Sequence, residues 1–459
     1  MTIGHFVGII VTLLAIVSLS VYSGKATKEK KGANLWVVAG AITGTLVGGS
    51  STVGTAQLAY QYGMSAWWYT LGGGIACLIL ALVYAKPLYK SGNKTVIEFI
   101  SKEYGEKNGL IASVLSSLGC FINIISQLIS ATAIIAVIIP TMPLIYSLLI
   151  SALFMVLYVF FGGAKGSGWV GILKLVLIYL AMIAMAALVL ALTKGPEGFI
   201  NLVKSISAAE GMNFGNFFAR GVGEDLGACF SLILGVITTQ TYAQAIFMAC
   251  DNKNAIKGAV LSSALIPPIG IGGILVGLYM RATYPSIVPK TALTLFVTEH
   301  MPPVLAGVIL GTLFVTVVGS GAGITLGIAT VLRRDVLPFI RGKRKKILSD
   351  LGTDRVLLVV LLLIGCILSA GPFGDTILNF AFMSMGLRGA TIFMPLCCAL
   401  WCPGAVNKVY AGVAIIAGPL SVLIFELCGV LPFEPLFGGV VLSAIIMLMG
   451  HFANKGALK

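Results

Sequence analysis

The chain has 459 residues, of which 58% are hydrophobic and only 10% are charged, and its mean hydropathy is +1.02. A water-soluble globule cannot hide this much apolar surface, so the composition excludes that class and predicts an all-α integral membrane protein. The formal net charge is +14. Most Lys and Arg fall in loops expected to face the cytoplasm, so the positive-inside rule explains the charge without a nucleic-acid partner.

Thirteen apolar runs are long enough to cross about 30 Å of hydrocarbon. An odd number of crossings puts the termini on opposite sides of the cytoplasmic membrane, and the loop charges place the N-terminus outside and the C-terminus in the cytoplasm. The first run lacks a basic start and a small-residue cleavage site, so we interpret it as a retained span. The runs lie at residues 5–23, 36–60, 66–86, 109–138, 142–162, 168–193, 226–249, 255–280, 303–332, 355–370, 375–400, 408–427 and 433–451.

The second run contains a stretch rich in Gly, Ser and Thr, GTLVGGSSTVGTAQLAYQYG at residues 44–63. Unpaired backbone is tolerated in a bilayer only where it is buried in protein or lines a polar cavity. Transporters use such broken helices to bind substrate and ions at the membrane midplane. We therefore predict a substrate site that includes Ser50, Ser51 and Thr52. The alternative is a small-residue face at which two membrane helices approach closely.

A second break is predicted at GVITTQTYAQA, Gly235 to Ala245, where Thr239, Gln240 and Tyr242 lie in mid-span. The two broken runs begin two five-span units, residues 36–193 and 226–400, which run in opposite directions because five is odd. Paired breaks in inverted repeats indicate the substrate site of a secondary transporter. Residues 5–23 form an extra helix before the first unit, and residues 408–451 form two helices after the second.

Arg388 lies near the middle of the eleventh run, too deep to reach the membrane surface easily. Its side chain either forms an ion pair with Glu224, Asp225 or Glu426, or binds a carboxylate of the substrate through its guanidinium fork. Because no comparably deep acid is present, we expect a small anionic or zwitterionic organic solute.

Other chemistries have little support in the sequence. The nine cysteines are scattered, the three histidines do not join them, and no GxxxxGK[ST] loop occurs, so we expect no metal, no cofactor and no ATP hydrolysis. Without clustered catalytic groups we expect no enzyme activity. A single asymmetric array of spans is not typical of a channel. A channel, or a non-transporting sensor built on a transporter fold, is the alternative function.

Five further stretches occur in an order that resembles the sodium:solute symporter family. They are AYQYGMSAWWYTLG, AKPLYKSGNKTVIEFISKEYG, YAQAIFMACDNKNAIKGA, FVTEHMPPVLAGVILG and IATVLRRDVL. The resemblance covers residues 5–451. It implies a LeuT-type fold with two inverted five-helix repeats, and symport of an organic solute with a coupling ion, Na⁺ in the family. It also implies a short amphipathic helix in TVIEFISKEYG and an external loop at TEHMPP.

The resemblance further implies a sodium site between the second and ninth runs. Its ligands fall on Gly44, Val47, Thr316, Gly319 and Ser320. The chain departs from the family pattern here, because glycine at position 319 stands where the family usually has a hydroxyl. A hard cation such as Na⁺ needs a full set of oxygen ligands, so the missing hydroxyl is expected to weaken Na⁺ binding.

The sixth run departs from the family pattern as well. Gly171 and Lys174 stand where the family usually carries a carboxylate and a Gln. Lys174 either extends to the cytoplasmic surface or replaces the coupling ion as a buried, titratable cation. On the second interpretation transport is coupled to H⁺, or needs no cation, in place of the Na⁺ of the family.

Overall fold

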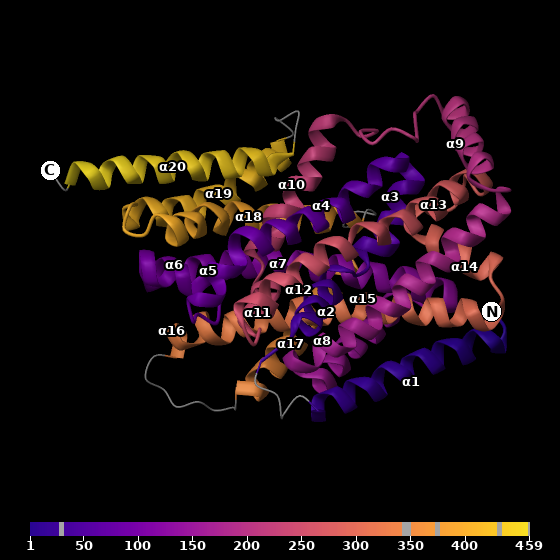
Figure 1. Cartoon of the computed structure of the whole chain (residues 1–459), viewed down its shortest axis with the longest axis horizontal. Coiled ribbons are helices and arrows are strands. Elements are labelled where there is room, and N and C mark those ends of the chain that lie inside the picture. The colour runs from indigo at the N-terminus through magenta and orange to yellow at the C-terminus, as the bar shows by residue number, and fades with distance from the viewer. Residues whose placement is uncertain (27–31, 342–349, 372–376, 429–433, 458–459) are drawn as a thin grey trace.

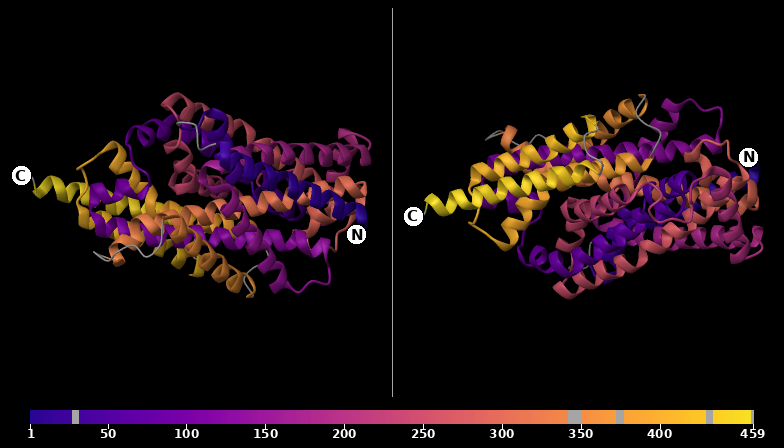
Figure 2. Two further views of the ribbon diagram at one scale, coloured as in Figure 1. Left: turned by 90° about the horizontal axis from the view of Figure 1, so that it is seen from below. Right: turned by 90° about the horizontal axis from the view of Figure 1, so that it is seen from above.

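The computed structural model describes residues 1–26, 32–341, 350–371, 377–428 and 434–457, and every regular element in these ranges is a helix. The helices form an elongated bundle with the N-terminus and the C-terminus at opposite ends of its long axis (Figure 1). The views from below and above show the same separation of the termini (Figure 2). The predicted fold class, an all-α membrane protein, agrees with this architecture.

The helices of the first half of the chain include two π-helical turns, η1 and η3, and one 3₁₀ turn, η2. Their bounds are α1 (Ile3–Ala26), α2 (Leu35–Leu46), η1 (Ser50–Gly54), α3 (Thr55–Tyr62), η2 (Gly63–Ala66), α4 (Trp67–Ile79), η3 (Leu80–Tyr84), α5 (Ala85–Lys90), α6 (Ile97–Tyr104), α7 (Glu106–Ile138), α8 (Leu144–Leu192) and α9 (Pro196–Glu210).

The second half of the chain is likewise made of α-helices, with one 3₁₀ turn, η4, and one π-helical turn, η5. The bounds are α10 (Val222–Thr238), α11 (Gln240–Phe247), α12 (Asn252–Leu265), α13 (Pro267–Thr283), η4 (Pro289–Thr291), α14 (Ala292–His300), α15 (Pro303–Val331), η5 (Leu332–Val336), α16 (Leu337–Arg341), α17 (Asp350–Ser369), α18 (Ile377–Trp401), α19 (Lys408–Cys428) and α20 (Pro435–Ala457).

The predicted count of thirteen spans is not confirmed. In the described ranges nine helices are long and apolar enough to cross a membrane, or ten if α10 and α11 form one bent span. Shorter apolar helical stretches cover Ile3–Ile16, Leu35–Leu46 and Leu144–Phe160. The spans predicted at 142–162 and 168–193 belong to one 49-residue helix, α8.

The predicted break in the second run is confirmed. α2 ends at Leu46, Val47 has an extended backbone with φ −81° and ψ 98°, and the chain resumes as η1 and α3. Glycine is required here by neighbouring helices. A Cβ on Gly48 would lie 2.6 Å from the Ser320 Cβ of α15, and one on Gly49 would clash with Ser130 of α7. The unwound segment is therefore enclosed by protein, as a bilayer demands.

The second predicted break is confirmed as well. Thr239 is extended between α10 and α11, with φ −88° and ψ 124°, and the two helices are bent by 48°. η1 contacts α7 and α18, while α11 contacts α2 and α15. Both breaks therefore pack against other helices of the bundle, whose polar side chains can form hydrogen bonds with the unpaired backbone groups.

Candidate functional site

A buried lysine reaches the break in the second run. Lys174 of α8 is only 1% exposed. Its Nζ donates to the carbonyl of Gly44, to the carbonyl of Thr316 at 2.9 Å and to Ser320 Oγ at 3.1 Å. Ser320 Oγ in turn donates to the carbonyl of Val47 at 3.0 Å. The interpretation that Lys174 extends to the cytoplasmic surface is wrong, because its amine is bonded inside the bundle.

Close approach of helices explains both departures at positions 171 and 319. A Cβ on Gly171 would clash with the carbonyl oxygen of Gly40, so α2 and α8 meet backbone to backbone. A Cβ on Gly319 would lie 3.2 Å from the ring of Tyr158, which is also on α8. α8 therefore places an amine beside Gly44 and an aromatic ring beside Gly319.

A cavity of about 40 Å³ lies beside Gly44, whose carbonyl accepts the hydrogen bond from Lys174. It lies between α2, α8, α11 and α15, and Gly44 and Gly319 form part of its wall. Its other lining residues are Ala41, Thr45, Tyr158, Val159, Thr241, Gln244, Met248, Ala322, Gly323 and Leu326. The Thr316 hydroxyl nearby is buried and has no hydrogen-bond partner within the described ranges.

A second buried cation lies at the break between α10 and α11. Arg388 of α18 is 1% exposed. Its Nη1 donates to Thr239 Oγ1 at 2.7 Å and to Cys120 Sγ at 3.3 Å, and its Nε donates to the Ser384 carbonyl at 3.1 Å. Its Nη2 has no hydrogen-bond partner in the part of the chain that the structure describes. All three partners are neutral.

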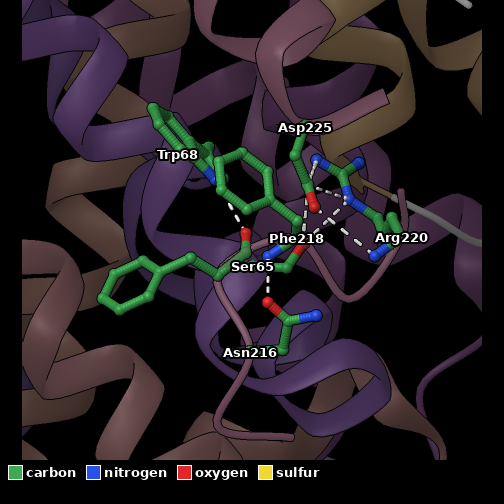
Figure 3. A network of polar contacts seen from close by, with 7 residues as sticks. Ser65, Trp68, Asn216, Phe218, Arg220 and Asp225 are labelled. Atoms are coloured by element: carbon green, nitrogen blue, oxygen red, sulfur yellow. Dashed lines mark hydrogen bonds and ion pairs between the residues drawn. The ribbon is translucent and has the colours of Figure 1, made fainter. Parts of the chain in front are cut away.

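The predicted acidic partners of Arg388 are absent from its contacts, and one of them is engaged elsewhere. Asp225 is paired with Arg220, whose Nη2 lies 2.7 Å from Asp225 Oδ1. Ser65 Oγ donates to the same carboxylate at 2.6 Å, and Trp68 Nε1 donates to the Phe217 carbonyl at 2.7 Å (Figure 3). The network joins the η2–α4 corner to the start of α10.

The hydroxyls predicted to bind substrate on η1 differ in their surroundings. Ser51 Oγ donates to the Gly48 carbonyl at 3.0 Å and accepts from the Gly48 N–H at 2.8 Å, and Thr52 Oγ1 donates to the same carbonyl at 2.8 Å. These two side chains cap the break. Ser50 instead reaches across to α7, where its Oγ lies 3.1 Å from Ser126 Oγ.

Sequence reasoning missed the polar face of α7 that receives the break. Asn123, Ser126, Gln127 and Ser130 recur at helical spacing in NIISQLIS, and all four are buried. Gln127 Oε1 accepts from the Gly49 N–H at 2.9 Å, and its Nε2 donates to Ser50 Oγ at 3.2 Å. The period of three and four within an apolar run is the signal that could have found them.

The predicted residues of the second break separate into two groups. Thr239 accepts a hydrogen bond from Arg388, and Tyr242, 2% exposed, lies three residues further along the chain on α11. Gln240 is not brought to this group by any hydrogen bond. Its amide is bonded to the backbone of residues 94–96.

Comparison with known proteins decides the family. The model of the "Sodium:solute symporter family" matches residues 31–418. The chain belongs to this family. It is 29% identical over 151 residues to the "Uncharacterized symporter YwcA" of Bacillus subtilis (strain 168), which is 32% of this chain and 29% of that protein. It is 24% identical over 178 residues to the "Sodium/glucose cotransporter" of Vibrio parahaemolyticus, 38% of this chain and 33% of that protein. The matches thus span about a third or less of these two relatives.

Longer matches exist at lower identity. The "High affinity choline transporter 1" of Homo sapiens is 22% identical over 432 residues, 91% of this chain and 72% of that protein. A solved "Na+-coupled sialic acid symporter" superposes with TM-score 0.75 at 16% identity, covering 99% of this chain and 98% of that one. MHP1, "a nucleobase-cation-symport-1 family transporter", superposes with TM-score 0.61 at 13% identity, covering 92% and 94%. These likenesses show the LeuT-type transporter fold, and the relatives are transporters rather than enzymes.

Within this symporter family, the positions that the resemblance assigns to a sodium site do converge in this chain. The Lys174 amine lies between the carbonyls of Gly44 and Thr316, beside Ser320. The oxygens that would coordinate a cation are therefore accepting hydrogen bonds from a side-chain amine. As arranged here they do not fit a sodium ion.

Proposed function

We propose that this member of the symporter family is a secondary active transporter that carries a small, carboxylate-bearing organic solute across the cytoplasmic membrane by alternating access. The N-terminus faces outside and the C-terminus faces the cytoplasm. Two inverted five-helix units, residues 36–193 and 226–400, form the transport core, with flanking helices at 5–23 and 408–451.

The observation that carries this proposal is the environment of Arg388. Among the described residues, the buried Arg388 guanidinium has only neutral partners and its Nη2 has none, which is costly because charge removed from water must be compensated. A substrate carboxylate that bonds to Arg388 would supply the missing charge and use the unpaired donor. Thr239, Tyr242 and the Ser50 hydroxyl lie on the two breaks that would complete the substrate site, with Ser51 and Thr52 holding one break in shape.

The second element of the proposal concerns the coupling ion. Lys174 occupies the space between Gly44, Val47, Thr316 and Ser320 that the family uses for Na⁺, and Gly319 offers no hydroxyl there. A sodium ion placed about 5 Å from an ammonium would cost about 3 kcal/mol at an effective dielectric constant of 20. We therefore propose that transport does not require Na⁺ and that the Lys174 amine takes the place of the cation. Transport is then either coupled to H⁺ or independent of any cation.

Uptake into proteoliposomes tests both elements. A thermal-shift screen of monocarboxylates, dicarboxylates and amino acids selects the labelled solute, with glucose and choline as controls because two relatives carry those names. We expect a carboxylate to be taken up equally in sodium and choline buffers at fixed pH, and an imposed pH gradient to reveal any H⁺ coupling. Strict sodium dependence together with a fully active Lys174→Ala variant would contradict the coupling proposal. Binding without uptake would indicate a sensor.

A further inference from the structure

A glutamine at the break of the second unit is bonded to a turn of the first unit. Gln240 is the first residue of α11 and is 7% exposed. Its Nε2 donates to the Lys94 carbonyl at 2.9 Å, and its Oε1 accepts from the Val96 N–H at 2.9 Å. The side-chain amide thus pairs with the backbone on both sides of Thr95, in the way that a neighbouring peptide group would.

The turn that Gln240 holds is itself well defined. The Lys94 N–H donates to Glu98 Oε2 at 3.0 Å, and the Glu98 N–H donates to Thr95 Oγ1 at 3.2 Å. The pattern is similar to a capping box, except that the Glu98 carboxylate accepts from the N–H of Lys94, one residue before Thr95. α6 packs against α7 and α18, and Tyr104 OH donates to the Pro395 carbonyl of α18 at 3.1 Å. The turn is therefore fixed to the helices that carry Gln127 and Arg388.

The residues on either side of Gln240 belong to the two candidate sites. Thr239, immediately before it, accepts a hydrogen bond from Arg388. Thr241, immediately after it, and Gln244, one turn further along α11, line the cavity whose wall includes Gly44 and Gly319. A displacement of α11 relative to the 94–96 turn would therefore change the Arg388 contact and the cavity wall together.

We propose that Gln240 is a positioning residue. Its amide is a clasp that holds α11 to the turn at residues 94–96 in the conformation in which the cavity beside Gly44 and Gly319 is open. The clasp opens when α11 moves to close that cavity, so making and breaking these two hydrogen bonds accompanies alternating access. The inference rests on the proposed transport cycle, but it does not depend on the identity of the solute or of the coupling ion.

These two hydrogen bonds also make Gln240 a poorer candidate for substrate binding than Thr239. Each end of its amide is already bonded to a backbone group, whereas Thr239 contacts the unsatisfied guanidinium. A substrate ligand at this position would have to give up both bonds. We therefore assign Gln240 to the mechanics of the break and not to substrate contact.

Two cysteine reporters test this role without a substrate. The exposed native cysteines Cys250, Cys402 and Cys428 are replaced by serine. Thr45→Cys then reports the cavity near Lys174. Phe382→Cys of α18 reports the region beside Arg220, whose guanidinium lies 5.6 Å from the Phe382 ring centroid and which does not line that cavity. The labelling rate of each reporter by the polar reagent methanethiosulfonate ethyltrimethylammonium is measured on purified full-length protein.

Loss of the clasp should shift the population between the two conformations. In the Gln240→Leu background we expect Thr45→Cys to label about tenfold more slowly and Phe382→Cys to label faster, since two hydrogen bonds are lost. Gln240→Glu, which is nearly isosteric and keeps the acceptor for the Val96 N–H, should give a smaller change in the same directions. Gln61→Leu in α3 is the control, because Gln61 does not line this cavity and its Oε1 has no hydrogen-bond partner among the described residues, and it should leave the ratio of the two rates unchanged.

The reciprocal change is the diagnostic outcome. If both reporters label faster in the Gln240→Leu background, the substitution only loosens the helix locally and the clasp is rejected. Unchanged rates at both reporters reject it as well. A reciprocal shift in a protein that takes up no carboxylate would leave the clasp standing while the proposed substrate failed, so the two results are separable.

Discussion

At the scale of single residues, the two buried cations differ in how the protein solvates them. Lys174 has three oxygen acceptors from α2 and α15, which together replace much of the water it has lost. Within the described ranges, Arg388 has two oxygen acceptors and one sulfur acceptor, and its Nη2 has no partner. The remaining demand for negative charge therefore lies at Arg388, which is why we place the substrate carboxylate there.

The first prediction concerns the guanidinium geometry of Arg388. Arg388→Lys keeps the positive charge but loses the fork that can bond to Thr239 and to a carboxylate at the same time. We expect substrate affinity to fall by about 1–3 kcal/mol, roughly 5- to 150-fold in Kd, while the melting temperature stays close to that of the parent. Isothermal titration of the carboxylate selected in the uptake screen measures it. Arg281→Lys, whose parent residue pairs with Glu210, is the control; equal affinities in the Arg388→Lys variant and the parent would return Arg388 to a structural role.

The second prediction concerns the contact between α2 and α8. In Gly171→Ala the new Cβ would clash with the Gly40 carbonyl, so the two helices must separate. Although alanine is the better helix former by about 1 kcal/mol, we expect a net loss of stability of about 1–3 kcal/mol and a lower melting temperature. In Gly386→Ala the Cβ would lie 3.6 Å from Leu436 Cβ, an ordinary contact, so this control should melt like the parent. A Gly171→Ala variant as stable as the parent would show that α2 and α8 can move apart at little cost.

At the scale of elements, the sequence predicted what depends on local composition. The breaks at residues 47–49 and 239 follow from glycine and hydroxyl residues in apolar runs, and both are confirmed. The merging of two predicted spans into α8 was missed, because hydropathy falls at 163–168 without a residue type that must end a helix. The α7 polar face was also missed, since its residues are dispersed among isoleucines and only their period marks them.

The third prediction concerns the contact of α20 with α10. Glu434 precedes α20 and lies over Gly227, and burial, with repulsion from Glu426 and Glu224, raises its pKa from 4.5 to about 7 despite Arg220. The folded state therefore keeps a proton that the unfolded chain releases near pH 4.5. Stability from this group is complete below that pH and is lost as pH rises through about 7, by up to about 3 kcal/mol.

Melting of the detergent-solubilised protein between pH 4 and 8 measures this effect. Glu434→Gln removes the titration, so we expect the variant to match the parent near pH 4 and to melt at a higher temperature than the parent above pH 7. The exposed Glu197 of α9 provides the control, and Glu197→Gln should follow the parent at every pH. Parallel curves for Glu434→Gln and the parent would mean that Glu434 titrates as an ordinary surface carboxylate.

At the scale of the whole molecule, fold class and family could be read from the sequence, while the state of each site could not. The high apolar content indicates a membrane protein, and the order of the five motifs along the chain indicates its family. Whether Lys174 extends to the surface or turns inward depends on how α8 packs against α2 and α15, which no single segment encodes. The partners of Arg388 likewise depend on Arg220, which precedes it by about 170 residues in the sequence. Arg220 forms an ion pair with Asp225 and so removes Asp225 as a partner of Arg388.

The last prediction concerns the orientation of the chain, and native cysteines suffice to test it. Three exposed cysteines lie at helix ends: Cys250 after α11, Cys402 after α18 and Cys428 at the end of α19. If the N-terminus faces outside, the predicted threading puts Cys250 and Cys402 in the cytoplasm and Cys428 outside. An impermeant maleimide added to intact cells should label the parent and lose that labelling in Cys428→Ser, while inside-out vesicles should be labelled through Cys250 and Cys402. The order of the spans is fixed, so the side of one loop sets the side of every other loop. Labelling of Cys250 from outside would therefore contradict the orientation predicted from the loop charges and would place the N-terminus in the cytoplasm.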